Sequence, residues 1–165
     1  MDVITTHLNA DFDGLASMVA GRYLYPGAVL VLPGGAQDAV RGFRAVHDLG
    51  MTRLNDLDLG QVTRLIVMDT HDPDRLGQLK ALWENPSVSI HIYDHHPPEE
   101  PSLYRSDLTV IEPVGATTTI LIERLKAQRI RIIPFEATVL ALGLYEETGS
   151  FAFGSTTPRD LDAAA

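Results

Sequence analysis

The 165-residue chain contains no cysteine, which excludes disulfides, thiolate zinc sites and a cysteine nucleophile. It also lacks a signal-peptide pattern and any run close to the ~20 apolar residues that a membrane helix needs. We therefore expect a cytoplasmic protein without a membrane partner. Basic residues are scarce: 13 Lys and Arg against 22 Asp and Glu give a formal net charge of -9. This charge argues against a broad electrostatic grip on long nucleic acid. A small or single-stranded substrate stays open, because bound metal ions offset clustered carboxylate charge.

The rest of the composition, 45% hydrophobic and 21% charged, is that of one ordinary globular domain. Short apolar runs alternate with longer segments of helical period. This pattern predicts an α/β fold with a mostly parallel sheet and helices on both faces, a Rossmann-like three-layer sandwich. The expected strands are 2–6, 28–32, 65–68, 88–93 and 109–111, with a proline-rich loop before the last. The expected helices are 14–24, 37–49, 75–83, 116–128 and 135–145.

A capped helix is also expected to start near Thr156-Thr157-Pro158. So close to the last residue, such a helix would have nothing to pack against. We therefore expect residues 1–165 to be one domain of a longer polypeptide.

The most informative feature is the ionisable triplet Asp94-His95-His96, which lies between an apolar run and two prolines. In an open α/β sheet, ligands bind at the carboxyl ends of the strands. Two other strand-like runs end in similar residues, His7, Asp11 and Asp13 in one case and Asp69, His71 and Asp72 in the other. Such strand ends predict one metal site assembled from distant parts of the sequence.

Taken singly, these residues have simpler interpretations. Asp13 is well placed to cap the helix that follows, and His7 and Asp11 could be polar loop residues. Asp69 ends an apolar strand, where a carboxylate is costly to bury unless it is paired or metal-bound. Asp69 is therefore our candidate for a carboxylate that bridges two ions. His71 could face the substrate or be a solvated loop residue.

His95 and His96 point to opposite sides if the strand geometry persists, so one can bind metal while the other faces substrate. Asp94 can supply the acceptor that orients an imidazole. Glu146-Glu147-Thr148-Gly149 ends the last long helical run, where the glutamates could simply close the helix before a C-terminal glycine. Mixed histidine and carboxylate ligands suit manganese or a related divalent ion.

In order along the chain, these motifs resemble those of the DHH phosphoesterase superfamily. Its members include RecJ-like exonucleases, oligoribonuclease/phosphoadenosine-phosphate phosphatases and family II inorganic pyrophosphatases. The motifs here are His7-Leu8-Asn9-Ala10-Asp11-Phe12-Asp13-Gly14, Met68-Asp69-Thr70, Asp94-His95-His96-Pro97 and Glu146-Glu147-Thr148-Gly149-Ser150-Phe151. The resemblance covers nearly all of residues 3–160 and corresponds to the catalytic N-terminal domain. It is similar in particular to a subgroup in which this domain precedes CBS domains and a tRNA nucleotidyltransferase or poly(A) polymerase-like head.

The resemblance implies two divalent ions, typically Mn²⁺, with Mg²⁺ or Co²⁺ as alternatives. One ion would be held by His7, Asp11 and Asp69, and the other by Asp13, Asp69, His95 and Glu147. The resemblance further implies catalytic roles for Asp69, Asp94 and His96, and substrate contacts from His71, His96, Thr148 and Gly149. The chain departs from the family at Glu147, where aspartate is usual. The resemblance also leads us to expect that the family's C-terminal substrate-binding domain lies outside residues 1–165, so linked C-terminal domains are expected partners and these residues alone are expected to hydrolyse slowly or not at all.

The expected function is manganese-dependent hydrolysis of phosphodiester or phosphomonoester bonds in short oligonucleotides or nucleotides. Two alternatives stay open. The first is inorganic pyrophosphate hydrolysis, although the sequence has no obvious Lys and Arg cluster for a small anion. The second is a non-catalytic nucleotide- or RNA-binding regulatory module in a nucleotidyltransferase fusion. Glu147 favours the module, whereas the otherwise complete ligand set favours an enzyme.

Overall fold

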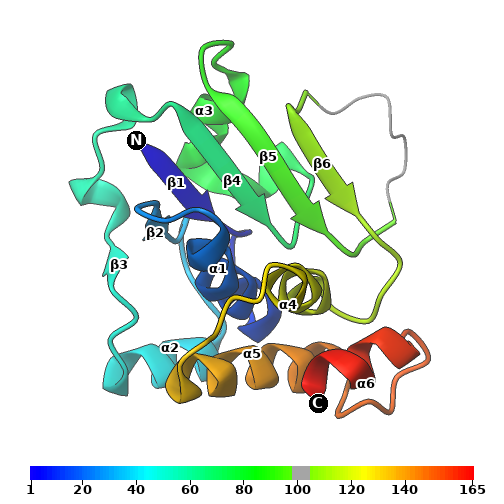
Figure 1. The fold of residues 1–165 in the computed structure, drawn as a ribbon. Coiled ribbons are helices and arrows are strands. Elements are labelled where there is room, and N and C mark those ends of the chain that lie inside the picture. The colour runs from blue at the N-terminus through cyan, green and yellow to red at the C-terminus, as the bar shows by residue number, and fades with distance from the viewer. Residues whose placement is uncertain (98–104) are drawn as a thin grey trace.

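Parallel strands form the centre of the molecule (Figure 1). The computed structural model describes residues 1–97 and 105–165, and its six-stranded sheet has the order β3-β2-β1-β4-β5-β6 with every described pair parallel. The strands are β1 (Asp2–Thr5), β2 (Val29–Val31), β3 (Met51–Thr52), β4 (Arg64–Met68), β5 (Ser89–Asp94) and β6 (Leu108–Ile111). The helices are α1 (Phe12–Leu24), α2 (Asp38–Val46), α3 (Lys80–Glu84), α4 (Thr117–Ala127), α5 (Pro134–Glu147) and α6 (Pro158–Ala164).

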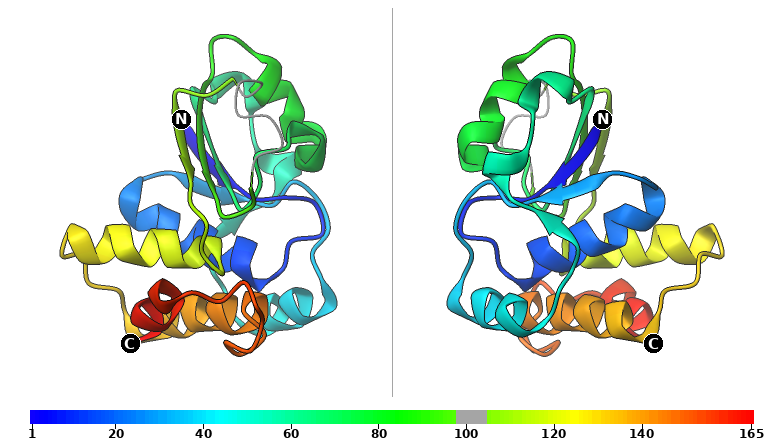
Figure 2. Two further views of the ribbon diagram at one scale, coloured as in Figure 1. Left: turned by 90° about the vertical axis from the view of Figure 1, so that its right-hand side faces the viewer. Right: turned by 90° about the vertical axis from the view of Figure 1, so that its left-hand side faces the viewer.

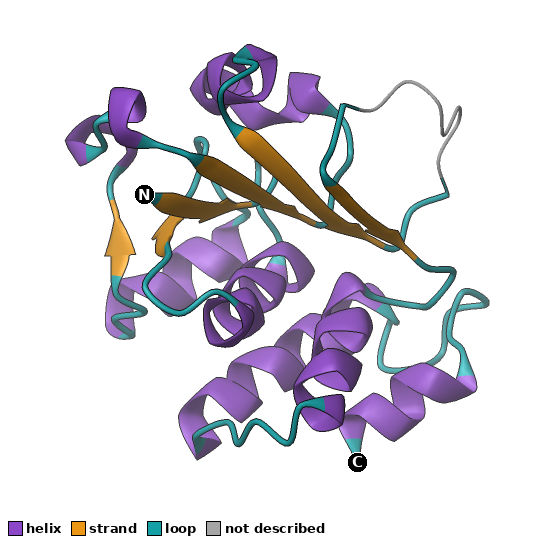
Figure 3. Cartoon of the chain, turned by 45° about the horizontal axis from the view of Figure 1, so that its top comes forward, coloured by secondary structure: helices purple, strands orange, loops and turns teal. Residues whose placement is uncertain are grey.

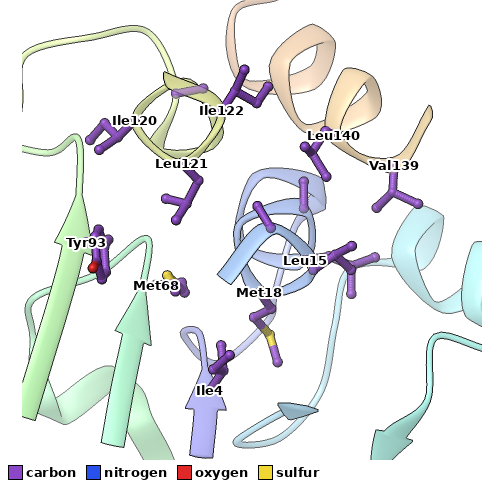
Figure 4. Close-up of a cluster of buried hydrophobic side chains, with 14 of the residues drawn as sticks. Ile4, Leu15, Met18, Met68, Tyr93, Ile120, Leu121, Ile122, Val139 and Leu140 are labelled. Atoms are coloured by element: carbon purple, nitrogen blue, oxygen red, sulfur yellow. The ribbon is translucent and has the colours of Figure 1, made fainter. Parts of the chain in front are cut away.

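Both faces of the sheet are buried, as expected where crossover helices cover a parallel sheet (Figure 3). Successive strand residues point to opposite faces. Ile4 and Met68 therefore join the hydrophobic core beneath α1 and α4 (Figure 4), whereas Val3 and Val67 join the core on the other face. Leu82 and Trp83 of α3 close that second core. The predicted fold class, with helices on both faces, is confirmed.

A further helical layer lies beyond α1 and α4. Helix α5 packs against α1 and α4, and the views in Figure 2 place α2, α5 and α6 together along the bottom of the molecule. The layer approaches α1 closely at Gly143 in α5: a Cβ atom there would lie 2.6 Å from Ala16 Cβ and 2.8 Å from Thr118 Oγ1. The absence of a side chain at Gly143 thus sets how deeply α5 sits, and with it the position of Glu147 at the end of this helix.

We expect Gly143→Ala to lower the free energy of unfolding by about 1–3 kcal/mol, because forcing a methyl group into a packed interface strains the contacts around it. Gly42→Ala in α2 is the matched control. Apart from its chain neighbours and the adjacent backbone of α2, no atom of the described residues lies within 4 Å of a Cβ placed at Gly42, so better helix propensity should raise stability by up to about 1 kcal/mol. Chemical denaturation measures both changes. Equal effects of the two substitutions would contradict the close approach of α1 and α5.

Besides two unpredicted 3-10 helices, Leu54–Asp56 and Leu59–Gln61, the structure differs from the sequence predictions in three elements. Strand β3 is not predicted, because its two residues are too few to show an alternating pattern. The predicted helix 75–83 is wrong in form: a 3-10 segment, Pro73–Leu79, breaks at Gly77 (φ 52°, ψ -130°) before α3 begins. The predicted helix 37–49 ends earlier, at Val46, because His47 is extended. The proline-rich loop expected before residue 109 lies partly outside the described residues.

Helix α6 does pack, so the expectation that it has no partner is wrong. Its buried Asp160 accepts hydrogen bonds from the Gly115 amide (2.9 Å) and the Thr119 hydroxyl (2.5 Å). The same carboxylate accepts the amide and hydroxyl of Thr157 in a capping box. Asp160 thereby ties α6 to the start of α4. None of the helices in the described part of the chain is both long enough and apolar enough to cross a bilayer.

Candidate metal centre

The loops that follow β1, β4 and β5 meet at the carboxyl edge of the sheet. Strands β1 and β4 are neighbours, with β2 and β3 beyond β1 and with β5 and β6 beyond β4. The boundary between β1 and β4 is thus a topological switch point, where open α/β sheets bind ligands. His7 lies in the loop after β1, Asp69 directly follows β4, and Asp94 ends β5. These segments, distant in sequence, therefore reach the same place.

The first group of donor atoms surrounds His7. Its Nε2 lies 3.5 Å from Asp11 Oδ2 and 3.3 Å from Asp69 Oδ2, while Nδ1 lies 2.8 Å from the Leu8 carbonyl oxygen. A proton on Nδ1 donates to that carbonyl, so Nε2 faces the two carboxylates. Burial lowers the pKa of His7, but hydrogen bonds with Asp11 and Asp69 outweigh it and raise the pKa to about 10. The two carboxylates thus strongly favour a cation between them.

The second group surrounds His95. Its Nε2 lies 3.9 Å from Asp13 Oδ2 and 3.7 Å from both Asp69 Oδ1 and Glu147 Oε1. Its Nδ1 lies 3.0 Å from the Val114 carbonyl oxygen, the acceptor that orients this ring. Nε2 is buried and has no hydrogen-bond partner among residues 1–97 and 105–165. Ligand atoms about 2.0–2.2 Å from one ion sit roughly 3–4 Å from one another, so these spacings suit a shared ion better than direct hydrogen bonds.

Asp69 belongs to both groups. Its two oxygens face different histidines, Oδ2 facing His7 and Oδ1 facing His95. The Thr117 hydroxyl donates to Oδ1 (2.8 Å), and the Asp69 amide donates to the Tyr93 carbonyl (2.8 Å). The Asp69 backbone is left-handed (φ 61°), a conformation rare outside glycine and tolerated best by Asp and Asn. Among the described residues, two sets of side chains each bring their donor atoms within 4.8 Å of one another: His7, Asp11 and Asp69 form one set, and Asp69, His95 and His96 form the other.

Asp13 is fully buried in the first turn of α1 and accepts hydrogen bonds from another helix. Its oxygens accept the amides of Thr117 (2.7 Å) and Thr118 (2.9 Å), which begin α4. The positive end of α4 thus faces a carboxylate. The interpretation of Asp13 as the cap of α1 is wrong, because Asp11 accepts the Gly14 amide (2.9 Å) and fills that position.

Asp94 holds two imidazoles. Its Oδ1 accepts His96 Nδ1 at 2.7 Å, and its Oδ2 pairs with Nδ1 of His71. The predicted orienting acceptor therefore serves His96 and His71, whereas His95 uses Val114. The side chain of His96 is 45% exposed and turned outward. The hydrogen bond to Asp94 is the main cause that raises the pKa of His96, to about 9.

The polar residues at the end of α5 have two roles: some lie at the candidate site and others stabilise the local structure. Glu147 reaches His95 and is partly exposed; burial first, and then the charges of Asp13 and Asp11, raise its pKa to about 7. Glu146 instead accepts the Phe12 amide (2.6 Å) at the start of α1. Thr148 is fully buried, and its hydroxyl accepts the amide of Phe151. Gly149 follows with a φ of 56°. Both residues build this turn, and their contact with substrate stays a prediction.

Two residues that support the centre are absent from the sequence-based site. Thr117 and Thr118 hold Asp13 and Asp69 through backbone amides and one hydroxyl. The available signal is the run Thr117-Thr118-Thr119 at the start of a predicted helix, where free amides and hydroxyls face an anion.

Together the fold and these contacts define a class: a parallel α/β domain with histidines and carboxylates gathered at its switch point. The chain belongs to the DHH family, because the family model described as "DHH family, N-terminal domain" matches residues 3–144. The family predicted from the motifs is thus confirmed.

Curated relatives and a solved structure agree with this membership. An A-adding tRNA nucleotidyltransferase of Geobacter sulfurreducens is 42% identical over 168 residues, covering 100% of this chain and 19% of that protein. The same-named protein of Aquifex aeolicus is 35% identical over 165 residues, covering 99% and 19%. The chain thus spans about a fifth of these relatives. A Methanococcus jannaschii protein assigned to the family II inorganic pyrophosphatases superimposes with a TM-score of 0.74 at 20% identity, covering 99% of this chain and 54% of that one, a likeness of fold.

Proposed function

We propose that this domain is a manganese-dependent phosphoesterase that hydrolyses short oligonucleotides or nucleotides. The observation that carries the proposal is the buried Nε2 of His95, which faces the carboxylates of Asp13, Asp69 and Glu147 and has no hydrogen-bond partner in the described part of the chain. A mixed set of imidazole and carboxylate donors suits Mn²⁺, with Mg²⁺ or Co²⁺ as substitutes.

The electrostatics of the cluster support a cationic occupant. Burial, and then the charge of Asp13, raise the pKa of Asp69 well above its ordinary value. Burial raises the pKa of Asp13 as well. Buried carboxylates this close together are costly in their ionised form unless positive charge lies among them. Divalent ions supply that charge, which is why the donor set fits them.

In this proposal, each side chain has a defined task. The first ion would be held by His7, Asp11 and Asp69, and the second by Asp13, Asp69, His95 and Glu147. When bound, such ions polarise phosphate oxygens and lower the pKa of a bound water. Asp94 fixes the exposed His96 through Nδ1, which leaves Nε2 to contact a phosphate oxygen of the substrate. His71, Thr148 and Gly149 complete the proposed substrate contacts.

The curated relatives support a nucleic-acid substrate. Both are named A-adding tRNA nucleotidyltransferases, and this chain corresponds to 19% of each. We infer that the domain works beside covalently linked domains in a polypeptide of that kind. The net charge of -9 is compatible with a short substrate held mainly at its reacting phosphate.

The test combines metal content with turnover. We expect two Mn²⁺ ions per chain by mass spectrometry, and Mn²⁺-dependent release of mononucleotide from a diadenosine dinucleotide by chromatography. Chelator-treated protein should lose turnover and regain it when Mn²⁺ is restored. Hydrolysis of pyrophosphate without hydrolysis of the dinucleotide would favour a pyrophosphatase. A metal-free chain that still binds nucleotide would favour a regulatory module.

A further inference from the structure

A polar cavity of about 460 Å³ lies beside the metal centre, on the side of His96. Asp94 and His96 line it, so the cavity is continuous with the site described above. The described residues around it are Thr70, His71, Asp72, Arg75, Asp94, His96 and Pro97.

Arg75 is the only arginine or lysine among the described residues of this wall. It is partly buried, and within residues 1–97 and 105–165 its guanidinium makes no hydrogen bond or ion pair. A half-buried guanidinium that has no partner among these residues, beside a metal centre, has its donors available for a ligand.

The backbone around Arg75 is fixed against the loop that carries His7. The Leu8 amide donates to the Arg75 carbonyl oxygen (2.7 Å), and the Arg75 amide donates to the Asp72 carbonyl oxygen (3.1 Å). The break at Gly77 brings this segment close: a Cβ there would lie 3.0 Å from the Pro33 carbonyl oxygen and 3.2 Å from Leu8 Cδ2. These backbone contacts therefore fix the position of the Arg75 main chain relative to the loop that carries His7.

We propose that Arg75, with His71 and His96, forms a subsite for a second phosphoryl group next to the one held at the metal centre. The carboxylates of the wall are already engaged, Asp94 by both histidines and Asp72 by the Asp74 amide. A guanidinium offers five N–H donors in a planar fork that matches phosphate oxygens. The substrate class is thus a compound with two adjacent phosphates rather than a simple phosphomonoester. This inference rests on the proposed function, because the metal centre defines the first phosphate.

Binding to slowly hydrolysed ligands tests the subsite without measuring turnover. Calorimetry in the presence of Mn²⁺ compares a phosphorothioate-linked diadenosine that carries a 5′-phosphate with the same compound lacking it. In the wild-type chain, the 5′-phosphate is expected to tighten binding about tenfold, as for a charge-assisted hydrogen bond. In Arg75→Gln this ratio should fall close to one. Arg131→Gln removes the same charge from an exposed position in the connection between α4 and α5, and should keep the wild-type ratio.

A second arm compares inorganic pyrophosphate with inorganic phosphate in the same three proteins. Chelation of Mn²⁺ by free ligand is the same for each protein, so differences between variants report on the subsite. Loss of preference in the dinucleotide arm assigns the second phosphate to nucleic acid, and loss in the pyrophosphate arm assigns it to inorganic diphosphate. Unchanged ratios for Arg75→Gln in both arms, or no preference in the wild type, overturn the proposal. A chain that binds with this preference but never hydrolyses contradicts only the proposed function.

Discussion

Asp69→Asn is expected to lower Mn²⁺-dependent hydrolysis by more than about 100-fold. Losing an outer-shell partner of a metal ligand costs up to about 100-fold, and Asp69 is proposed as a ligand itself. It should also lower bound Mn²⁺ from two ions per chain to one or none. The reason is geometric: the two oxygens of Asp69 face His7 and His95, so both groups of donors lose an anionic ligand at once. Asparagine is the informative replacement because it tolerates the left-handed backbone at this position.

Metal analysis and a dinucleotide assay measure the effect, and circular dichroism checks the fold. Asp56→Asn, which removes the same charge from an exposed position, is the control and should behave as wild type. Because metal content is read separately, the prediction stands even where turnover by this domain is slow. Two Mn²⁺ ions retained by Asp69→Asn would contradict the shared-ligand assignment.

The largest effect on stability is expected from Asp160→Ala, which should lower the free energy of unfolding by about 3 kcal/mol. The buried carboxylate accepts bonds from Gly115, Thr119 and Thr157, and its removal leaves these donors unpaired. For a chain of this size, the loss corresponds to a fall in Tm of roughly 6–12 °C. Asp162→Ala, exposed on the same helix, is the matched control for thermal unfolding. A Tm unchanged by Asp160→Ala would refute the role of this contact.

The same carboxylate gives the effect a pH dependence. Burial raises the pKa of Asp160, but hydrogen bonds from Thr119, Thr157 and Gly115 outweigh it, and the pKa lies below the ordinary value of 3.8. The stabilisation is therefore complete above pH 3.8 and is lost as pH falls through the lower folded value. The stability difference between wild type and Asp160→Asn should shrink in that acid range.

Much of the fold could be predicted because its strands are local patterns. The apolar runs at β1, β4 and β5 are long enough to show strand character, and the polar residues that end them mark the edge of the sheet. Strand β3 and the break at Gly77 depend on tertiary contacts. The two residues of β3 are too few to show a periodic pattern. The sequence around Gly77 follows a helical pattern and does not indicate that this glycine adopts a positive φ.

The candidate site was predictable in its composition but not in its supports. The strand-end positions of His7, Asp69 and His95 were visible in the sequence. The partners of Asp13 and Asp69 were not, because α4 approaches from more than a hundred residues away in the case of Asp13. The guanidinium of Arg75, which has no ion pair within the described part of the chain, was equally hidden, since only packing shows which arginines remain without one.

The bond from the Phe12 amide to Glu146 spans 134 positions and has a consequence for biosynthesis. At about 5–20 residues per second, a ribosome needs roughly 7–27 s to make that stretch. Until residue 146 is made, the nascent β1–α1 unit lacks the bond to Glu146, and until residues 117 and 118 are made it also lacks the α4 amides that later hold Asp13. The candidate metal centre is therefore among the last features to form on the growing chain, after most of the sheet has been translated.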